Sequence, residues 1–487
     1  YFGASDPLNL VAKTIDINEN IHVLGAQYYN ISNTDLLLLK YNSDGDLQWV
    51  RTYASPGNIS DNPVNLCTDS LCNIYIIGNK GVYSYNVDFL VLKYDSSGTQ
   101  QWMRQYNAGK SPTSQDYVTD LVTDNHGNLY VSGYSIEQNA LVNLVTIKYN
   151  ALGRQQWVRT FFSGDYSQNP GIYNADLSVD NLGNTYLAGS CIDVPGNNTK
   201  YLIIKRNPAG DVLWTVKKDI NLSGPDNATG MALDKAGNIF VTGNSGTVKY
   251  DNDGNFIWHQ PGNFNKILVD NSDNIYVGNI GPADFLKKYD NITGNVLWSL
   301  NENPVYDFFV DRNNNIYFGS TDNCWKADSA GNIVASITFP YQAVSACISP
   351  NLNLYVAGYE PQNDSNYASY SIYMSKYSQC PSLAPLRTML SVSPEDDRQI
   401  KVEEKHFMIV PNPNNGEMWL ISKTLIDFGT YISIYDLTGR EAYRKQINEM
   451  SDRVQISTSG LDNGIYLYTV ISAQGKMLAK DKLVIIK

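Results

Sequence analysis

The sequence predicts an all-β protein made mainly of one repeated four-stranded unit. Two observations support this prediction. The segment DNHGNLYVSG at residues 124–133 recurs in close variants along most of the chain, and the hydrophobic periodicity of a helix is almost absent. The variants begin at residues 19, 72, 183, 237, 273, 314 and 351. Each one joins a tight Asn/Asp turn to a short apolar strand.

A complete unit is seen at residues 120–161, as DLVTD, NLYVSG, LVTIKYN and RQQWVRTF with Asn/Asp and Gly at the turns. A glycine closes the second strand of each unit, at Gly25, Gly78, Gly133, Gly189, Gly243, Gly278, Gly319 and Gly358. Four-stranded repeats at intervals of 35 to 56 residues indicate a β-propeller. Its blades cover both faces of one another, which explains strands that are apolar at nearly every position.

The repeats place the propeller at residues 1–380 and predict eight blades. The fourth strand of most blades begins near a tryptophan whose ring we expect to wedge against the next blade, namely Trp49, Trp102, Trp157, Trp214, Trp258 and Trp298. The eighth repeat, at 345–380, shows only three strands, so its closing strand is expected to be short or missing. A seven-bladed ring with a remnant stays open as an alternative.

Residues 381–404 lack the repeat and are predicted to be a linker with Pro, Ser and mixed charge. A different pattern begins at residue 405. Short strands with Gly turns, such as YISIYDLTG and GIYLYTVISAQG, predict a small Ig-like β-sandwich at 405–487.

The C-terminal segment resembles the type A sorting domain of the bacterial type IX secretion system. The resemblance is carried by VPNPNNGEMWL, ISIYDLTGRE, LDNGIYLYTV and the terminal KLVIIK, in the expected order. The residues that it marks for sorting are Pro411, Asn412, Pro413, Gly416, Tyr435, Asp436, Gly439, Arg440, Gly464, Tyr466 and Lys482. It implies export across the outer membrane to the cell surface or the medium, with the outer-membrane translocon and its shuttle protein as partners of 405–487.

The N-terminal region resembles the bacterial propeller repeats called SBBP repeats, on units such as VTDNHGNLYVSGYS followed by IKYNALGRQQWVRTF. The resemblance is good over the first four blades and weaker afterwards. It implies a fold and an extracellular setting, and it implies no reaction.

Composition excludes some partners. The formal net charge of -12 disfavours nucleic acid and anionic lipid. No stretch reaches the roughly 18 apolar residues of a membrane span, so we expect no direct membrane insertion. The chain begins at Tyr1 rather than Met, and we expect a leader to have been removed.

No catalytic residues, metal site or cofactor are predicted, and we expect a protein that is not an enzyme. The histidines have no metal-ligand spacing. The acidic stretches 251–254 and 311–315 suit tight turns better than calcium loops, because they lack the bidentate Glu of an EF-hand. Cys67 and Cys72 flank one predicted turn and either form a disulfide or are ordinary buried thiols.

The connections from second to third strand, and from one blade to the next, leave the same face of a propeller. They are long in blades one to four and in blade eight, and rich in Tyr, Asn, Ser, Asp and Gly, a composition typical of adaptable binding surfaces. The candidate contacts on this face are Tyr28, Tyr29, Tyr83, Tyr85, Tyr117, Tyr166, Tyr173 and Tyr367. We expect a glycan or surface protein as ligand, while drift in exposed loops explains the same pattern.

The sequence thus favours a secreted or surface binding and adhesion protein. Two alternatives remain open. One is a polysaccharide-acting hydrolase or lyase on the propeller scaffold, which needs a carboxylate pair or another reactive set converging at the channel mouth. The other is a structural subunit that stays with the type IX translocon or the gliding apparatus.

Overall fold

The structure is a computed structural model. It describes residues 8–485 except 31–32, 57–58, 83–84, 109–114, 138–140, 166–175, 193–198, 222–224, 280–285, 301–306, 320–322, 339–341, 349–353, 363–368, 378–385, 392–406, 411–416, 427–428, 437–439, 448–450 and 474–476. Every helix or strand assigned in this part is a β-strand, which confirms the all-β prediction. No helix of the described residues is long and apolar enough to span a membrane.

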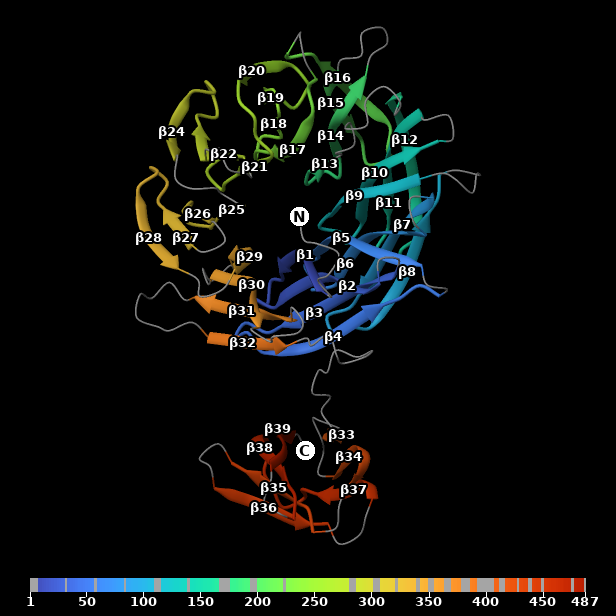
Figure 1. Cartoon of the computed structure of the whole chain (residues 1–487), viewed down its shortest axis with the longest axis vertical. Coiled ribbons are helices and arrows are strands. Elements are labelled where there is room, and N and C mark those ends of the chain that lie inside the picture. Colours follow the sequence, from blue (N-terminus) through green and yellow to red (C-terminus); the bar gives the residue numbers. More distant parts are fainter. Residues whose placement is uncertain are drawn as a thin grey trace. The chain divides into compact units, whose positions relative to one another are not determined.

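The chain divides into two compact units, residues 1–396 and 397–487. In the first unit, β1–β32 form a ring of eight blades, each a meander of four consecutive antiparallel strands (Figure 1). The innermost strands are β1 (Leu8–Ile15), β5 (Ser60–Thr68), β9 (Gln115–Thr123), β13 (Asp176–Val179), β17 (Ala228–Leu233), β21 (Lys266–Val269), β25 (Asp307–Val310) and β29 (Gln342–Ile348).

The other strands follow outward from the axis in chain order. The second strands are β2 (Ile21–Asn30), β6 (Ile74–Val82), β10 (Leu129–Ile136), β14 (Thr185–Ile192), β18 (Ile239–Gly243), β22 (Ile275–Gly278), β26 (Ile316–Gly319) and β30 (Leu354–Gln362). The third strands are β3 (Asn33–Tyr41), β7 (Tyr85–Tyr94), β11 (Leu141–Tyr149), β15 (Thr199–Arg206), β19 (Gly246–Tyr250), β23 (Leu286–Tyr289), β27 (Asn323–Ala327) and β31 (Ser369–Tyr377). The outermost strands are β4 (Leu47–Tyr53), β8 (Gln100–Tyr106), β12 (Gln155–Asp165), β16 (Val212–Lys218), β20 (Phe256–Gln260), β24 (Val296–Leu300), β28 (Ile333–Thr338) and β32 (Leu386–Ser391).

The core lies between blades rather than within them. In β14 every residue is buried, as expected for a strand covered on both faces. One hydrophobic cluster joins Ile77 and Phe89 of blade two to Val118 and Val131 of blade three. Because each sheet needs its neighbour to bury both faces, the blades stabilise one another around the ring.

The eighth blade is complete, which differs from the sequence-based expectation. β32 pairs with β31 in antiparallel register, Ile372 opposite Leu390, so a strand lies inside the predicted linker 381–404. Its segment LRTMLS has neither the tryptophan found in the outer strands of blades one to six nor the Asn/Gly turn that precedes the other outer strands, and no repeat signal marked it. The innermost strand β29 contacts both β25 and β1, which closes the ring.

The second unit is a two-sheet sandwich. One sheet has the order β33 (Phe407–Val410), β34 (Glu417–Ile426), β37 (Ser451–Ser457), and the other β36 (Glu441–Gln446), β35 (Tyr431–Tyr435), β38 (Gly464–Ile471), β39 (Met477–Ile485). Both sheets contribute to one core, with Met418 and Ile456 from the first and Ile434 and Val470 from the second.

The two ends of the propeller are built differently. In each blade, one end carries the connections from first to second strand and from third to fourth strand, and we call it the turn end. We call the opposite end the loop end. First turns span five residues, as in 124–128, and the second turns of blades one to seven span five or six, as in 150–154 and 290–295, whereas β31 and β32 of blade eight are separated by eight residues. Loop-end connections vary from two residues, as in 244–245, to ten, as in 166–175.

Candidate functional site

In blades one to seven, the first turn is organised by one aspartate. In blade three, Asp124 Oδ1 accepts the backbone N–H groups of His126 and Asn128, each at 2.9 Å. Its Oδ2 accepts Asn128 Nδ2 at 2.8 Å and the Tyr130 hydroxyl at 3.1 Å. Gly127 adopts φ 72°, a conformation that favours glycine. The same carboxylate–amide turn is built on Asp16, Asp69, Asp180, Asp234, Asp270 and Asp311.

These contacts account for the acidic stretches 251–254 and 311–315. Asp251 and Asp311 each accept two backbone N–H groups and the side-chain amide of the asparagine four residues on. The prediction that these stretches form turns is therefore confirmed. Among the described residues, no group of three or more His, Cys, Asp or Glu is placed to hold a metal ion.

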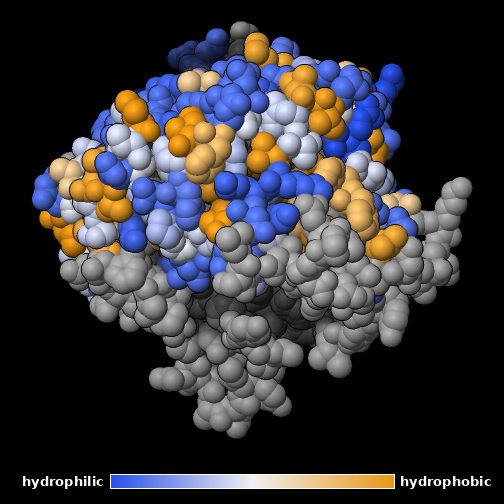
Figure 2. Space-filling model, turned by 90° about the horizontal axis from the view of Figure 1, so that it is seen from above, coloured by the Kyte–Doolittle hydropathy of each residue, from blue (hydrophilic) through white to orange (hydrophobic). Residues whose placement is uncertain are grey.

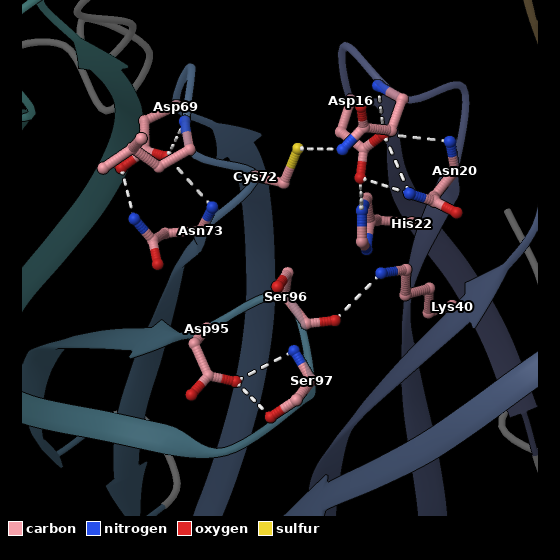
Figure 3. Close-up of polar contacts among 12 residues, drawn as sticks. Asp16, Asn20, His22, Lys40, Asp69, Cys72, Asn73, Asp95, Ser96 and Ser97 are labelled. Carbon is pink, nitrogen blue, oxygen red and sulfur yellow. Dashed lines mark hydrogen bonds and ion pairs between the residues drawn. The ribbon is translucent and has the colours of Figure 1, made fainter. Parts of the chain in front are cut away.

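Blade one replaces the hydroxyl donor of this turn by a histidine (Figure 3). His22 Nε2 lies 3.0 Å from Asp16 Oδ2, and both side chains are fully buried. Burial raises the pKa of Asp16, but hydrogen bonds from His22 and Asn20 outweigh it and leave the pKa at about 2. Burial lowers the pKa of His22 in spite of the carboxylate. A neutral imidazole therefore donates its Nε2 proton to an ionised Asp16.

Cys72 lies beside this pair in Figure 3, on the first turn of blade two. Its Sγ accepts a hydrogen bond from Asn18 Nδ2 at 3.1 Å. Burial raises the pKa of the Cys72 thiol, so it is not an activated thiolate at neutral pH. Cys67 and Cys72 are both free, which corresponds to the buried-thiol alternative rather than a disulfide.

Adjacent blades are joined at the turn end by a three-part contact, which we call the blade latch. In blade three, the Trp157 ring lies against Gly210 of the next blade, and Trp157 Nε1 donates to the Pro208 carbonyl at 3.1 Å. Lys148 Nζ donates to the same carbonyl at 3.4 Å and lies 5.0 Å from the centre of the Tyr130 ring. The structural role predicted for the tryptophans is confirmed.

The latch recurs around the ring. The tryptophans Trp102, Trp214, Trp258 and Trp298 donate to Ala151, Asn252, Asn291 and Ser329. The lysines Lys40, Lys93, Lys205, Lys249 and Lys288 reach Ser96, Ala151, Asn252, Asn291 and Ser329. Sequence reasoning missed the lysines, although the repeated Lys near the end of each third strand, as in LVTIKYN, is the signal that marks them.

A second polar network lines the axis, four residues before the turn aspartates. Asn65 Nδ2 donates to Asp120 Oδ1 at 3.2 Å, and Asp120 and Asp176 are hydrogen-bonded to each other. Each carboxyl also accepts a backbone N–H from the next blade, Leu177 N at 3.0 Å for Asp120 and Met231 N at 2.6 Å for Asp176. These hydrogen bonds link the innermost strands of blades two to five.

Burial raises the pKa of Asp120 well above that of an ordinary carboxyl, and the Asp176 charge raises it further. Burial also raises the pKa of Asp176. Two facing carboxyls of this kind share one proton, because two negative charges in contact repel each other. Sequence analysis did not identify this pair, since the two residues are 56 positions apart and meet only when blades three and four pack side by side.

The opposite side of the axis carries cations. Asp307 on β25 accepts Lys13 Nζ from β1 at 3.3 Å and Lys266 Nζ from β21. Burial raises the pKa of Asp307, but the two ammonium groups outweigh it and hold the pKa below its ordinary value. This ion-pair set joins blades six and seven to blade one.

Of the predicted ligand-face tyrosines, only Tyr117 has a described side chain. Its half-buried ring stacks on Tyr134, with 5.2 Å between centroids, near the loop end of blade three. Tyr28 and Tyr29 lie in β2 and Tyr85 begins β7, so these three are strand residues rather than loop residues, and their side chains lie outside the described part. The remaining tyrosines that lie outside the described residues are Tyr83, Tyr166, Tyr173 and Tyr367.

The asymmetry of the loop end takes a different form from the one predicted. Blades one and two extend their strands toward this end, with ten residues in β2 and in β7, whereas β22 and β26 have four. Blade eight is also long, with nine residues in β30 and in β31. Residues 26–34 and 79–87, which sequence analysis placed in long connections of blades one and two, therefore lie mostly in strands.

The sorting residues are described in part. Asp436 Oδ1 accepts the Arg440 N–H at 3.0 Å, and the Arg440 side chain is 82% exposed. Tyr435 ends β35, Gly464 begins β38, and the Tyr466 hydroxyl donates to the Asp462 carbonyl at 3.1 Å. Lys482 lies in β39 with its side chain outside the described part. The predicted residues Pro411, Asn412, Pro413, Gly416 and Gly439 also lie outside it.

Comparison with known families identifies the C-terminal unit. Residues 408–487 match the family model described as secretion system C-terminal sorting domain. The chain ends in a sorting domain. This match indicates export through type IX secretion to the cell surface or the extracellular space. Residues 101–139 match the β-propeller repeat family, and residues 299–322 match the two component regulator propeller family.

A search of curated proteins found no match. Solved structures similar to the chain include BamB from Moraxella catarrhalis, with TM-score 0.44 and 14% identity over 72% of this chain and 94% of that chain. A europium-containing methanol dehydrogenase has TM-score 0.46 and 12% identity over 73% and 85% of the two chains. The Dos1 propeller has TM-score 0.47 and 10% identity over 73% and 90%.

Proposed function

We propose that this exported protein binds a glycan or a surface protein through the loop end of the propeller, on blades eight, one, two and three. The observation that carries the proposal is the contrast between the two ends. In blades one to seven, turn-end connections span five or six residues and are closed by backbone hydrogen bonds at an Asp or Asn, whereas loop-end connections range from two to ten residues. Variable connections on a rigid scaffold are where binding residues concentrate.

The polar groups of the turn end support this assignment. The turn aspartates, latch lysines and latch tryptophans form hydrogen bonds within the turns and between neighbouring blades, and these bonds hold the ring together. Recognition at that end would have to break these contacts. The loop end offers stacked aromatic rings such as Tyr117 and Tyr134, the kind of surface on which sugar rings and peptide side chains pack.

The hydrolase or lyase alternative draws less support from the described residues. Carboxyl groups of glycoside hydrolases stand roughly 5 to 9.5 Å apart, so that sugar and water fit between them. Asp120 and Asp176 are in direct hydrogen-bond contact, and both are bonded to backbone N–H groups. We assign this pair to the stability of the ring.

We further propose that the type IX translocon and its shuttle protein recognise the unit 405–487. Arg440 supports this, because its side chain is largely exposed while ion-paired with Asp436 in the β35–β36 connection. A structural subunit that stays with the translocon is the competing function, and it predicts no ligand for the propeller.

A binding experiment separates these functions. The full-length protein is applied to a glycan array and to intact bacterial cells, beside Tyr117→Ala and a matched Leu182→Ala variant at the turn end, where Leu182 is 79% exposed. We expect specific binding that Tyr117→Ala weakens by about tenfold and Leu182→Ala leaves unchanged. Absence of glycan and cell binding, with a folded protein, would favour the translocon subunit.

A further inference from the structure

The outer rim of blades four to seven exposes pairs of large apolar residues. They occupy the first two positions of the outermost strands and are 42% to 55% exposed. The pairs are 212–213 (Val, Leu), 256–257 (Phe, Ile), 296–297 (Val, Leu) and 333–334 (Ile, Val), which together we call the rim band. Figure 2 views the rim from the edge at the top of Figure 1 and shows hydrophobic patches set among hydrophilic residues.

The same two positions are both polar in blades two and three, while blades one and eight begin with one leucine followed by a polar residue, Leu47-Gln48 and Leu386-Arg387. Blade two has Gln100 and Gln101, and blade three has Gln155 and Gln156, all exposed. Scattered exposed apolar residues are normal on protein surfaces. A pair that recurs at one position of four consecutive blades, and is replaced by glutamine in two others, is not scattered. The fold does not need apolar residues here.

Edge strands with exposed apolar residues are an aggregation hazard that proteins usually avoid. The outermost strand of each blade pairs on one side only, so β16, β20, β24 and β28 are edges. Phe256 and Ile257 begin one of these edges, directly after the second turn of blade five. Retaining an apolar pair at such edges implies a partner that covers it.

Charge indicates the chemistry of that partner. The second turns that precede the rim band, 207–211, 251–255, 290–295 and 328–332, contain Asp residues and no Lys or Arg of their own. Latch lysines of the preceding blades donate to backbone carbonyls of these turns, and Lys218 Nζ lies 4.6 Å from the centre of the Phe256 ring. Hydrogen bonds from within the turns lower the pKa of Asp251, Asp290 and Asp328. These carboxylates therefore stay ionised in mildly acidic media, and Asp211 is 69% exposed beside Arg159.

We propose that the rim band binds a segment of a partner protein whose aliphatic side chains are flanked by Lys or Arg. Aliphatic residues cover the exposed pairs, and the basic flanks meet the carboxylates of the second turns. A second copy of this chain is disfavoured because it would bring like charges together. An anionic membrane is disfavoured for the same reason. The site is separate from the loop end and does not depend on the function proposed there.

The test uses the full-length protein and a short synthetic peptide of alternating Val and Thr flanked by Lys, with a Glu-flanked peptide as control. We expect the Lys-flanked peptide to bind at least about tenfold more tightly than the Glu-flanked one, and more weakly as salt rises. Changing Val212, Leu213, Phe256 and Ile257 to Gln should lower the affinity for the Lys-flanked peptide by a similar factor.

The glutamine variant is a matched one, because Gln-Gln-Trp already stands in blades two and three. An unchanged melting temperature shows that it folds. As a second control, Asp251→Asn removes charge and keeps the apolar pair, and it should weaken the salt dependence. Equal affinity of wild-type and glutamine variant for the peptide overturns the proposal. Two other results also overturn the proposal if the peptide does not bind. One is concentration-dependent dimerisation that the glutamine variant abolishes. The other is binding to vesicles of phosphatidylcholine and phosphatidylglycerol that the glutamine variant abolishes.

Discussion

The aspartates of this propeller behave in two ways according to what surrounds each carboxyl group. Asp124 at a turn receives amide and hydroxyl hydrogen bonds, which outweigh burial and lower its pKa. Asp120 at the axis meets another carboxyl, and burial raises its pKa. One residue type thus supplies fixed negative charge at the turn end and a shared proton at the axis.

The axial pair gives a pH prediction. The pKa of Asp120 is higher in the folded protein than in the unfolded chain, where it has the ordinary carboxyl value of 3.8. As pH rises above 3.8, the unfolded chain loses this proton more readily than the folded protein, so the free energy of unfolding decreases. Asp120→Asn imitates the protonated carboxyl and can still donate to Asp176. We expect its melting temperature to fall less than that of the wild type between acid and neutral pH.

The control is Asp120→Ala, which removes the charge and also the hydrogen bonds to Asn65 and Leu121. It should be less stable than the Asn variant at every pH, by roughly 1 to 3 kcal/mol. A constant gap in melting temperature between wild type and Asp120→Asn across this range contradicts a shared proton.

At the scale of the element, the blade latch depends on a missing side chain. A Cβ on Gly210 would lie 2.9 Å from the Trp157 ring, and Gly210 has φ 84°. Gly183 in a first turn has a similar φ of 80°, but its nearest neighbour would be 3.5 Å from such a Cβ. Both glycines avoid strain in the left-handed region, and only Gly210 also makes room for a neighbouring blade.

Comparing Gly210→Ala with Gly183→Ala isolates the latch. Both changes carry the backbone penalty, and Gly210→Ala adds a steric clash with Trp157. We expect Gly210→Ala to lower the free energy of unfolding by about 1 to 3 kcal/mol more than Gly183→Ala does, as measured by urea unfolding. An equal decrease in the free energy of unfolding for the two variants would show that the Trp157 ring moves aside without a loss of stability.

The repeated elements are also what the sequence could predict. Apolar second strands, Asn/Asp turns and the tryptophan positions recur, so their structure follows from a pattern that local chemistry explains. β32 was missed because LRTMLS carries no turn signal and no tryptophan. The loop tyrosines were placed in loops because Tyr28, Tyr29 and Tyr85 follow no apolar alternation, whereas pairing with neighbouring strands extends β2 and β7 through them.

The Asp120–Asp176 pair and the Asp307 set were beyond sequence reasoning for a different reason. Their partners lie far apart in the chain and are brought together only by the geometry of the ring. Asp307 meets Lys13 across 294 positions. No local pattern encodes such a meeting.

For the whole molecule, Asp307 helps to hold blade one to blades six and seven. Its pKa is lowered by Lys266 and Lys13, so its contribution to stability is present above 3.8 and is lost as pH falls. Asp307→Asn should cost roughly 1 to 3 kcal/mol at neutral pH and speed hydrogen exchange in β1.

Asp211→Asn is the matched control, because the Asp211 carboxylate forms an exposed ion pair with Arg159 at 3.8 Å and an exposed hydrogen bond with Asn207 Nδ2 at 3.2 Å. Such surface pairs contribute about 0 to 1 kcal/mol, so this variant should resemble the wild type. If exchange in β1 is as slow in Asp307→Asn as in the control, the ion pairs do not hold the ring closed.

Export gives a prediction on the same scale. Removing residues 397–487 deletes the whole sorting unit and leaves the propeller unit 1–396 intact. We expect the truncated chain to stay in the periplasm, as seen by fractionation and by surface labelling of intact cells. Surface labelling at the wild-type level would contradict a sorting role for the unit.

Each blade consists of four strands consecutive in the chain, including the one that seals the circle. Within the described strands, no blade takes a strand from the opposite terminus. Circular permutation that joins the ends of the propeller and opens it between any two blades therefore leaves every sheet whole. For the same reason, inserting or deleting one repeat changes the circumference of the ring and leaves the strand order of each sheet unchanged.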